Sequence, residues 1–305
     1  MSDLDSYRAT HARARGFIDD WRPQAKTRVL LDLARSILDE YAAHLPLTVR
    51  QVFYRLVAKH GFQKTEHAYA SLGEHLNTAR RAGVVPFEAI RDDGFARSGQ
   101  SGFDDADTFI DLCHERAARF TLDRQQGQPE RLAVWCEARG MVPQLERVAR
   151  VYGVEVFSSG GFDSVSVKHD IAREFAAACD DHDAVRVLHV GDHDPSGVHL
   201  FLSLAEDVQC FARAYGGVVH FERIAVLPEH VGRYHLVTAP PKLTDRRAFH
   251  GETTQCEALP PDVLADLLRD SIEAHIDTAI YDTVLDREAQ ERARLLDHFA
   301  RFGKA

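Results

Sequence analysis

The second half of the chain alternates short runs of apolar, mostly β-branched residues with segments of helical character. The four runs are 131–136, 154–159, 184–190 and 218–227, and the segments between them are 139–151, 164–179 and 196–208. Continuous apolar strands that alternate with helices are typical of a mainly parallel sheet covered on both faces. We therefore expect an α/β fold here, with any functional site at the carboxyl ends of the strands.

The first hundred residues show a helical pattern instead. Apolar residues recur at three- and four-residue spacing in 27–45, 47–61 and 66–83. Thr48 is a suitable N-cap for the second of these helices, and Gly61 is a suitable stop. Three helices followed by a short extended piece favour a small winged-helix or helix-turn-helix unit, and the same pattern also fits an ordinary helical bundle.

The segment "RDDGFARSGQSGFDD" (91–105) is rich in Gly, Ser and Asp and reads as a linker. We place the domain boundary there, with a helical domain over 1–100 and an α/β domain over 105–305 that ends in a helix at about 262–301. Residues 1–100 carry 15 Lys and Arg against 12 Asp and Glu, whereas the rest carries 22 against 35. A DNA-binding module joined to a metal-holding module would show this asymmetry, as would ordinary surface variation.

Composition narrows the setting of the protein. At 305 residues, 45% hydrophobic and 28% charged, the chain resembles a soluble globular protein. No apolar run approaches the roughly 18–20 residues of a membrane span, and the N-terminus lacks the apolar core of a secretory signal. The five cysteines include no CxxC pair, so neither a zinc ribbon nor a disulfide framework is indicated. We expect a cytoplasmic, nucleoid-associated protein without a membrane partner.

Two of the predicted strands end in acidic residues. Glu137 follows the strand at 131–136, and Asp192 and Asp194 follow the strand at 184–190 through Gly191. If the two strands are neighbours, three carboxylates converge at one edge of the sheet. Three oxygen ligands without cysteine suit Mg²⁺, and the glycine lets a metal or a phosphate come close.

A plainer interpretation is that the acids cap the helices that follow them. Asp194 directly precedes Pro195 and is well placed to cap the helix at 196–208. We interpret His193 and His199 as surface or core residues rather than as metal ligands.

The stretch "TVRQVFYRLV" (48–57) raises a second candidate for chemistry. Tyr54 falls beside the apolar stripe of this helix, and Arg50 lies one turn earlier on the same face. A guanidinium next to a phenol favours the phenolate and can hold a phosphate, so the pair could serve phosphodiester chemistry. The alternative is a boundary tyrosine packed against Phe53, with an ordinary surface arginine.

Taken together, these segments resemble the A subunit of DNA topoisomerase VI and its meiotic double-strand-break relatives. "TVRQVFY" (48–54) is similar to the tyrosine motif of that family, and "VWCEARGM" (134–141) and "HVGDHDPSG" (189–197) are similar to the Glu and DxD motifs of its Toprim domain. "KLTDRRAF" (242–249) and "CEALPPDVLADLL" (256–268) resemble its closing segments more loosely. The likeness spans roughly residues 27–280 and is nearest to short stand-alone members.

The resemblance implies a winged-helix domain followed by a Toprim domain, in a homodimer that acts on double-stranded DNA. Tyr54 of one protomer would attack a DNA phosphorus opposite the metal site of the other and stay linked to the 5′-phosphate. Glu137, Asp192 and Asp194 would hold Mg²⁺, and Arg50 would stabilise charge on the phosphorus.

The sequence departs from the family at Phe53, which replaces the first residue of a common Tyr-Tyr pair, and at 158–174, where a proline-containing motif is expected. The chain shows no GHKL ATPase, which in the full topoisomerase is a separate B subunit. DNA cleavage is therefore a firmer expectation than strand passage. The residues that we expect to contact DNA phosphates are Arg55, Lys59, Arg80 and Arg81.

Two other functions compete with tyrosine-dependent cleavage. One is a Toprim endonuclease of the plasmid- or phage-defence type, in which metal-activated water cuts DNA and Tyr54 is dispensable. The other is a DNA-binding regulatory subunit with an inactive Toprim fold. Three mutually repelling acids argue against this last function.

Overall fold

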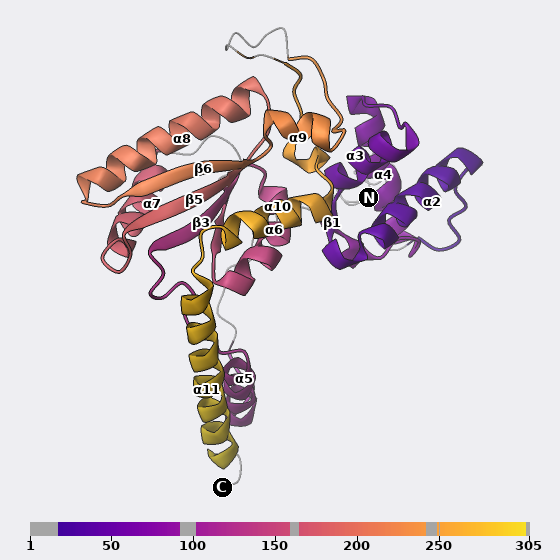
Figure 1. The fold of residues 1–305 in the computed structure, drawn as a ribbon. Coiled ribbons are helices and arrows are strands. Elements are labelled where there is room, and N and C mark those ends of the chain that lie inside the picture. The colour runs from indigo at the N-terminus through magenta and orange to yellow at the C-terminus, as the bar shows by residue number, and fades with distance from the viewer. Residues whose placement is uncertain (1–17, 92–101, 159–164, 242–248, 250, 303–305) are drawn as a thin grey trace, which may run out of the picture. The chain divides into compact units, whose positions relative to one another are not determined.

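The computed structural model describes residues 18–91, 102–158, 165–241, 249 and 251–302 (Figure 1). The chain divides into two compact units. One holds the residues up to Asp92 together with Pro260–Asp262, and the other holds Asp93–Leu259 and Val263–Ala305. In the part of the chain that the structure describes, none of the helices combines the length and the apolar character needed to cross a bilayer.

The first unit is mainly helical, as its sequence pattern predicts. Its elements are α2 (Ala25–Glu40), a 3-10 turn (Ala42–His44), β1 (Leu47–Thr48), α3 (Val49–His60), α4 (Glu66–Arg81), a 3-10 turn (Phe87–Ala89) and β2 (Ile90–Arg91). The two short strands pair in parallel. Three helices in the expected places are confirmed, with the first ending in a 3-10 turn. The specific winged-helix arrangement stays a prediction.

Helix α3, which carries Tyr54, has the start and the stop that the sequence indicates. The Thr48 hydroxyl accepts a hydrogen bond from Gln51 N at 3.1 Å, and the Gln51 side chain accepts one from Thr48 N at 2.9 Å. This reciprocal capping box satisfies two backbone donors at the start of the helix. Gly61 ends the helix in the left-handed region, at φ 62°, where a residue without Cβ is favoured.

The second unit is an α/β domain. Before its sheet comes α5 (Ala106–Ala118). The strands are β3 (Glu130–Cys136), β4 (Glu155–Phe157), β5 (Ala184–Val190) and β6 (Val219–Ala225), and the helices that follow them are α6 (Val142–Ala149), α7 (Val165–Ala178), α8 (Pro195–Ala214) and α9 (Pro228–Arg233). The sheet has the order β4-β3-β5-β6, and every pairing is parallel. The expected parallel α/β sheet is confirmed, whereas the finer Toprim assignment stays a prediction.

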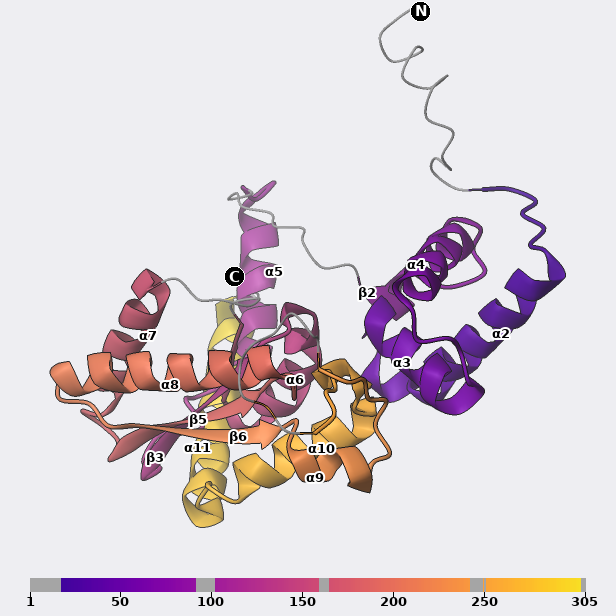
Figure 2. The same ribbon diagram turned by 90° about the horizontal axis from the view of Figure 1, so that it is seen from above.

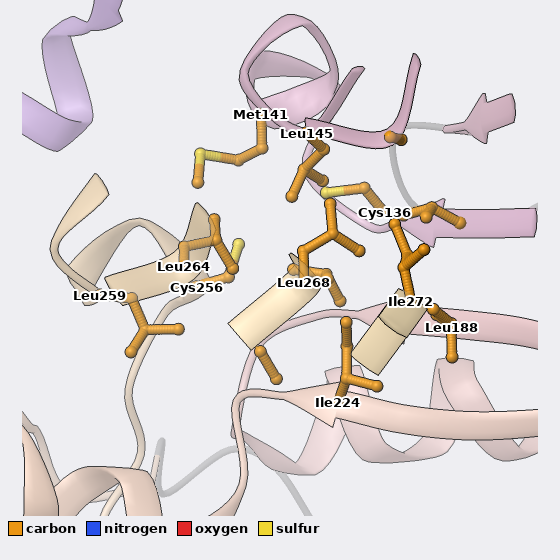
Figure 3. Packing of buried hydrophobic residues seen from close by; sticks show 14 of the residues in the cluster. Cys136, Met141, Leu145, Leu188, Ile224, Cys256, Leu259, Leu264, Leu268 and Ile272 are labelled. Atoms are coloured by element: carbon orange, nitrogen blue, oxygen red, sulfur yellow. The ribbon is translucent and has the colours of Figure 1, made fainter. Parts of the chain in front are cut away.

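Helices cover both faces of this sheet because alternate residues of each strand point to opposite sides. On one face, Leu132, Val134 and Cys136 of β3 share a core with residues of α6 and α10 (Pro261–Glu273), as Figure 3 shows for part of the cluster. On the other face, Ala133 and Trp135 pack with residues of α7 and α8. Helix α8 lies along β6 in both views (Figures 1 and 2).

The C-terminal segment forms two helices rather than the single one expected. After α10 the chain turns into α11 (Thr278–Phe302), whose C-terminal part lies beside α5 (Figure 1). The Asp277 carboxylate accepts hydrogen bonds from Ala279 N at 2.9 Å and Ile280 N at 3.2 Å, which starts the new helix. The Gln128 side chain also accepts from Asp277 N, at 2.8 Å, and fixes the turn.

The strand order creates a switch point between β3 and β5. From β3 the chain passes through α6 to β4 on one side, and it then returns through α7 to β5 on the other side. At such a point the connections leave the sheet in opposite directions and open a crevice at the carboxyl ends of the two strands. The fold therefore favours a site where β3 and β5 end.

Removing the cap of α3 is expected to weaken the helical unit. We predict that Thr48→Ala costs about 1 kcal/mol of unfolding free energy, since the N-cap hydrogen bond to Gln51 N is lost. Urea unfolding followed by circular dichroism measures it. Thr78→Ala is the control, because that hydroxyl only bonds back to the carbonyl of Glu74 within α4. Equal stability of the two variants would contradict the prediction.

Candidate metal centre

Adjacent parallel strands bring the acidic residues to one edge of the sheet. β3 and β5 pair directly, with Cys136 opposite Val190. Glu137 continues this pairing, since its N–H donates to the carbonyl of Val190 at 2.9 Å. Asp192 follows two residues after β5, and its N–H donates to Glu137 Oε2 at 3.1 Å. The condition for convergence, that the two strands be neighbours, is met.

The turn after β5 needs glycine at two positions. A Cβ on Gly191 would lie 2.6 Å from His189 Cε1 and 2.9 Å from Glu137 Oε2. A Cβ on Gly197 would overlap the carbonyl oxygen of Asp192 and lie 3.0 Å from Glu137 Oε2. Because both positions abut the Glu137 carboxylate, the glycines are what let this side chain reach the turn.

Asp194 caps the helix that follows it. Its Oδ1 accepts a hydrogen bond from Gly197 N at 2.7 Å at the start of α8, with Pro195 as the first helical residue. The capping interpretation therefore holds for Asp194. A capping carboxylate keeps its charge and a second oxygen, so this role is compatible with a nearby cation.

Asp192 is held against a residue that sequence reasoning overlooked. Its Oδ1 accepts a hydrogen bond from Cys256 N at 2.8 Å. Ligand atoms of Asp192, Cys256 and Glu257 all lie within 4.8 Å of one another. Glu137 and Asp194 are not members of this close group. Glu257 lies in the segment "CEALPPDVL", which the resemblance had marked, but nothing in its spacing indicated that it would join the acids.

Burial and like charges raise the pKa values of Asp192 and Glu137. Burial raises the pKa of Asp192 to about 7, and the neighbouring Glu257, Glu137 and Asp194 add to the effect. The pKa of Glu137 is also raised, first by burial, although the N–H of Asp192 opposes the shift. Carboxyls that resist ionisation in this way favour a proton or a cation between them.

A half-buried arginine holds the turn in place. Arg223 of β6 donates to the carbonyl of Gly191 at 3.2 Å, to that of Gly197 at 3.3 Å, and to that of Asp192. Its positive charge acts to lower the pKa of Glu137, but burial, the Asp192 N–H and the charge of Asp194 have larger effects on that pKa. Because its hydrogen bonds go to backbone oxygens, Arg223 balances part of the negative charge and leaves the carboxylate oxygens for other partners.

The two histidines of the motif behave as expected. His199 is exposed on α8. His193 is 8% exposed, packs with its ring centroid 5.0 Å from that of Phe249, and forms an isolated bridge with Thr254 through the backbone. Burial, followed by the charge of Arg223, lowers the pKa of His193. Neither histidine belongs to the close group of ligand atoms.

In the helical unit, Tyr54 is 5% exposed and lies among aromatic and basic side chains. The Tyr54 ring centroid is 5.6 Å from that of Phe53 and 5.7 Å from Lys64 Nζ. The Arg50 guanidinium is placed over the ring of Tyr69, 5.7 Å from its centroid. The tyrosine is thus packed in its unit, with cations close by.

The four residues expected to contact phosphates differ in exposure. Arg55 and Arg80 are 5% and 7% exposed, and Arg80 donates to the carbonyl of Ile90 at 3.2 Å. Lys59 is exposed and forms an ion pair with Glu40 on α2. Arg81 is half-buried. Lys59 and Arg81 are therefore better placed than the other two to meet a DNA backbone.

Comparisons with protein-family models, with curated proteins and with solved structures found no match for this chain. The fold and the site define an α/β protein that gathers acidic residues at the carboxyl edge of a parallel sheet. The topoisomerase-like resemblance depends on the short motifs alone.

The glycine at position 197 is expected to be essential to the site. We predict that Gly197→Ala lowers the melting temperature by several degrees, because the new methyl group collides with the backbone of Asp192. Gly232→Ala on α9 is the control, since a Cβ there meets nothing within 4 Å. Differential scanning calorimetry measures both. A Gly197→Ala protein as stable as the control would contradict this geometry.

The contribution of Asp192 to the stability of the metal-free protein should fall as the pH rises through the acidic range. The pKa of Asp192 is raised from 3.8 to about 7 in the folded chain. The folded state therefore binds more protons than the unfolded state between these values, and stability declines from about pH 4 to about pH 7. We predict a decline on the order of a few kcal/mol.

Asp192→Asn should flatten this decline, and Asp181→Asn on the exposed turn after α7 should not. Urea unfolding in EDTA at several pH values measures the effect. Parallel profiles for Asp192→Asn and the wild type would contradict it.

Proposed function

We propose that this protein cleaves the DNA backbone in a reaction that requires Mg²⁺ held by Glu137, Asp192 and Asp194. The observation that carries the proposal is the meeting of half-buried carboxyls at the ends of β3 and β5, with the pKa of Asp192 raised to about 7. A divalent cation relieves the repulsion and gives the acids a ligand role. Oxygen donors without a deprotonated thiol suit Mg²⁺.

The chemistry that Mg²⁺ supplies at such an edge is Lewis-acid stabilisation of a phosphate oxygen. The chain's own contribution is to fix the carboxylates through the backbone of the turn. Arg223 and the two glycines do this, since they set the path of the chain past Glu137. DNA carries the negative charge that such a cation would bind.

In the first version of the reaction, Tyr54 is the nucleophile. Its Oη bonds to a DNA phosphorus, the bond from phosphorus to the 3′-oxygen breaks, and that oxygen leaves as a hydroxyl with the proton that the phenol lost. The 5′-phosphate stays linked to the protein. Arg50 and Lys64 supply positive charge in the same unit. In this version a homodimer brings Tyr54 of one protomer to the metal of the other, and a GHKL ATPase partner would be needed only for strand passage.

In the second version, water is the nucleophile and Tyr54 has a packing role. The observation that favours it is the 5% exposure of Tyr54 and its edge-to-face contact with Phe53. A metal held by the acids would supply Lewis-acid activation of that water, and hydrolysis would leave no covalent adduct. Both versions need the same acids, so the tyrosine distinguishes them.

The decisive comparison uses supercoiled plasmid with Mg²⁺ and four proteins: wild type, Asp192→Asn, Tyr54→Phe and Tyr69→Phe. We predict that the wild type nicks or linearises the plasmid and that Asp192→Asn loses at least about 100-fold in rate, since a metal ligand is lost. Tyr69→Phe is the matched control, because Tyr69 packs against Phe53 in the same unit. Denaturation in detergent before electrophoresis traps any covalent complex.

If Tyr54→Phe abolishes cleavage and the adduct while Tyr69→Phe keeps both, Tyr54 is the nucleophile. If Tyr54→Phe cuts at the wild-type rate and no adduct forms, hydrolysis by water is the reaction. Cleavage by Asp192→Asn equal to that of the wild type would overturn the proposed function in both versions.

A further inference from the structure

Glu257 is a buried carboxyl that the proposed reaction does not yet use. It lies in the 3-10 turn Cys256–Ala258 and is 7% exposed. Its carboxylate lies close to that of Asp192, with ligand atoms of the two residues within 4.8 Å of each other. A carboxyl placed in an apolar core beside another acid costs free energy unless something positive lies between them.

The turn around Glu257 is fixed so that its side chain faces Asp192. Thr254 bridges to the backbone of His193 in both directions, at 2.9 and 3.0 Å. Cys256 N then donates to Asp192 Oδ1 at 2.8 Å. These bonds tie the segment before α10 to the turn after β5, and ligand atoms of Asp192, Cys256 and Glu257 come within 4.8 Å of one another. The carboxylate oxygens of Asp192 and Glu257 are therefore close enough to bind one ion together.

A second observation points to a ligand at the same edge. His189, the penultimate residue of β5, is 3% exposed, and its Nδ1 is buried without a hydrogen-bond partner in the part of the chain that the structure describes. Nδ1 lies 3.4 Å, and Glu137 Oε2 lies 2.9 Å, from the point where a side chain on Gly191 would begin. An unpartnered nitrogen beside a ligand carboxylate indicates that a polar group belongs there.

Asp194 and Glu257 differ in how they are placed relative to Asp192. One of its oxygens caps α8 through Gly197 N at 2.7 Å. It lies outside the group of close ligand atoms, whereas Glu257 is a member. Arg223 does not bind the carboxylate oxygens through these contacts, since its hydrogen bonds go to the carbonyls of the turn.

We propose that Glu257 is a further ligand of the cation site and that a divalent ion binds between Asp192 and Glu257. The inference rests on the cation site of the proposed function, but it needs neither DNA cleavage nor Tyr54. Cys256 contributes its N–H to Asp192, and its thiol donates a hydrogen bond to Glu257 Oε2 at 3.4 Å. The ion is therefore held by oxygen atoms, as Mg²⁺ and Mn²⁺ prefer.

The test is titration of the full-length protein with Mn²⁺, followed by isothermal calorimetry and by the electron paramagnetic resonance signal of free Mn²⁺. We expect Glu257→Gln to weaken binding about tenfold or more, since removal even of groups that support a metal ligand has effects of that size. Glu229→Gln is the matched control, because Glu229 is an exposed acid on α9, and it should bind within about twofold of the wild type.

Folding is checked by melting the proteins in EDTA. Glu257→Gln should melt no lower than the wild type, since it removes a like charge beside Asp192. A second measurement needs no substitution at all. Fe²⁺ bound in place of Mn²⁺, with ascorbate and hydrogen peroxide, cuts a protein backbone next to the ion. We expect cuts near 192 and near 256–257.

The outcomes separate the two proposals. Wild-type affinity in Glu257→Gln, or iron cuts only near 137 and 192–194, overturns the role of Glu257 and leaves the proposed function standing. Absence of Mn²⁺ binding by the wild type overturns both. Weakened binding in Glu257→Gln together with cuts near 256–257 supports the inference whatever the plasmid assay shows.

Discussion

The parallel pairing of β3 with β5 is the interaction on which the site depends. It ends both strands at the same level and forces the residues that follow them to share one edge. Like charges at that edge repel, and backbone groups of the chain offset part of the repulsion. Asp192 N binds Glu137, and Cys256 N binds Asp192. Arg223 adds a positive charge and holds the turn through its carbonyls.

This arrangement explains why the cluster stays in an energetically costly form. Hydrogen bonds from the backbone fix where Glu137 and Asp192 point. A backbone N–H carries no full positive charge, so these bonds do not neutralise the carboxylates. The pKa of Asp192 and that of Glu137 are both raised, which is the direction that burial and mutual repulsion produce. In the proposed function, a cation bound in the cluster would restore the balance and would let a phosphate backbone approach the acidic residues.

Sequence periodicity was enough to predict the strands of the large sheet, helices α2 to α4 and helices α6 to α8. The ends of α3 could be predicted as well, because they depend on two local residues, Thr48 and Gly61. The convergence of Glu137 with Asp192 followed from one condition, the adjacency of two strands. Contacts between residues far apart in the sequence leave no local pattern from which they could be predicted. The backbone bridge between Thr254 and His193 brings Glu257 close to Asp192.

The break between α10 and α11 could not be foreseen for the same reason. Gln128 fixes it from a position 149 residues away. The packing of Tyr54 was likewise hidden, since its position beside the apolar stripe left its burial undecided.

The most direct test of the account is a crystal structure of the protein grown or soaked with Mn²⁺, with anomalous diffraction data to locate the ion. The account predicts one strong anomalous peak at the carboxyl edge of the sheet, coordinated by Asp192 together with Glu257 or Glu137. Saturating Mn²⁺ with no peak at this edge, and with the acids still hydrogen-bonded only to the chain, would contradict it.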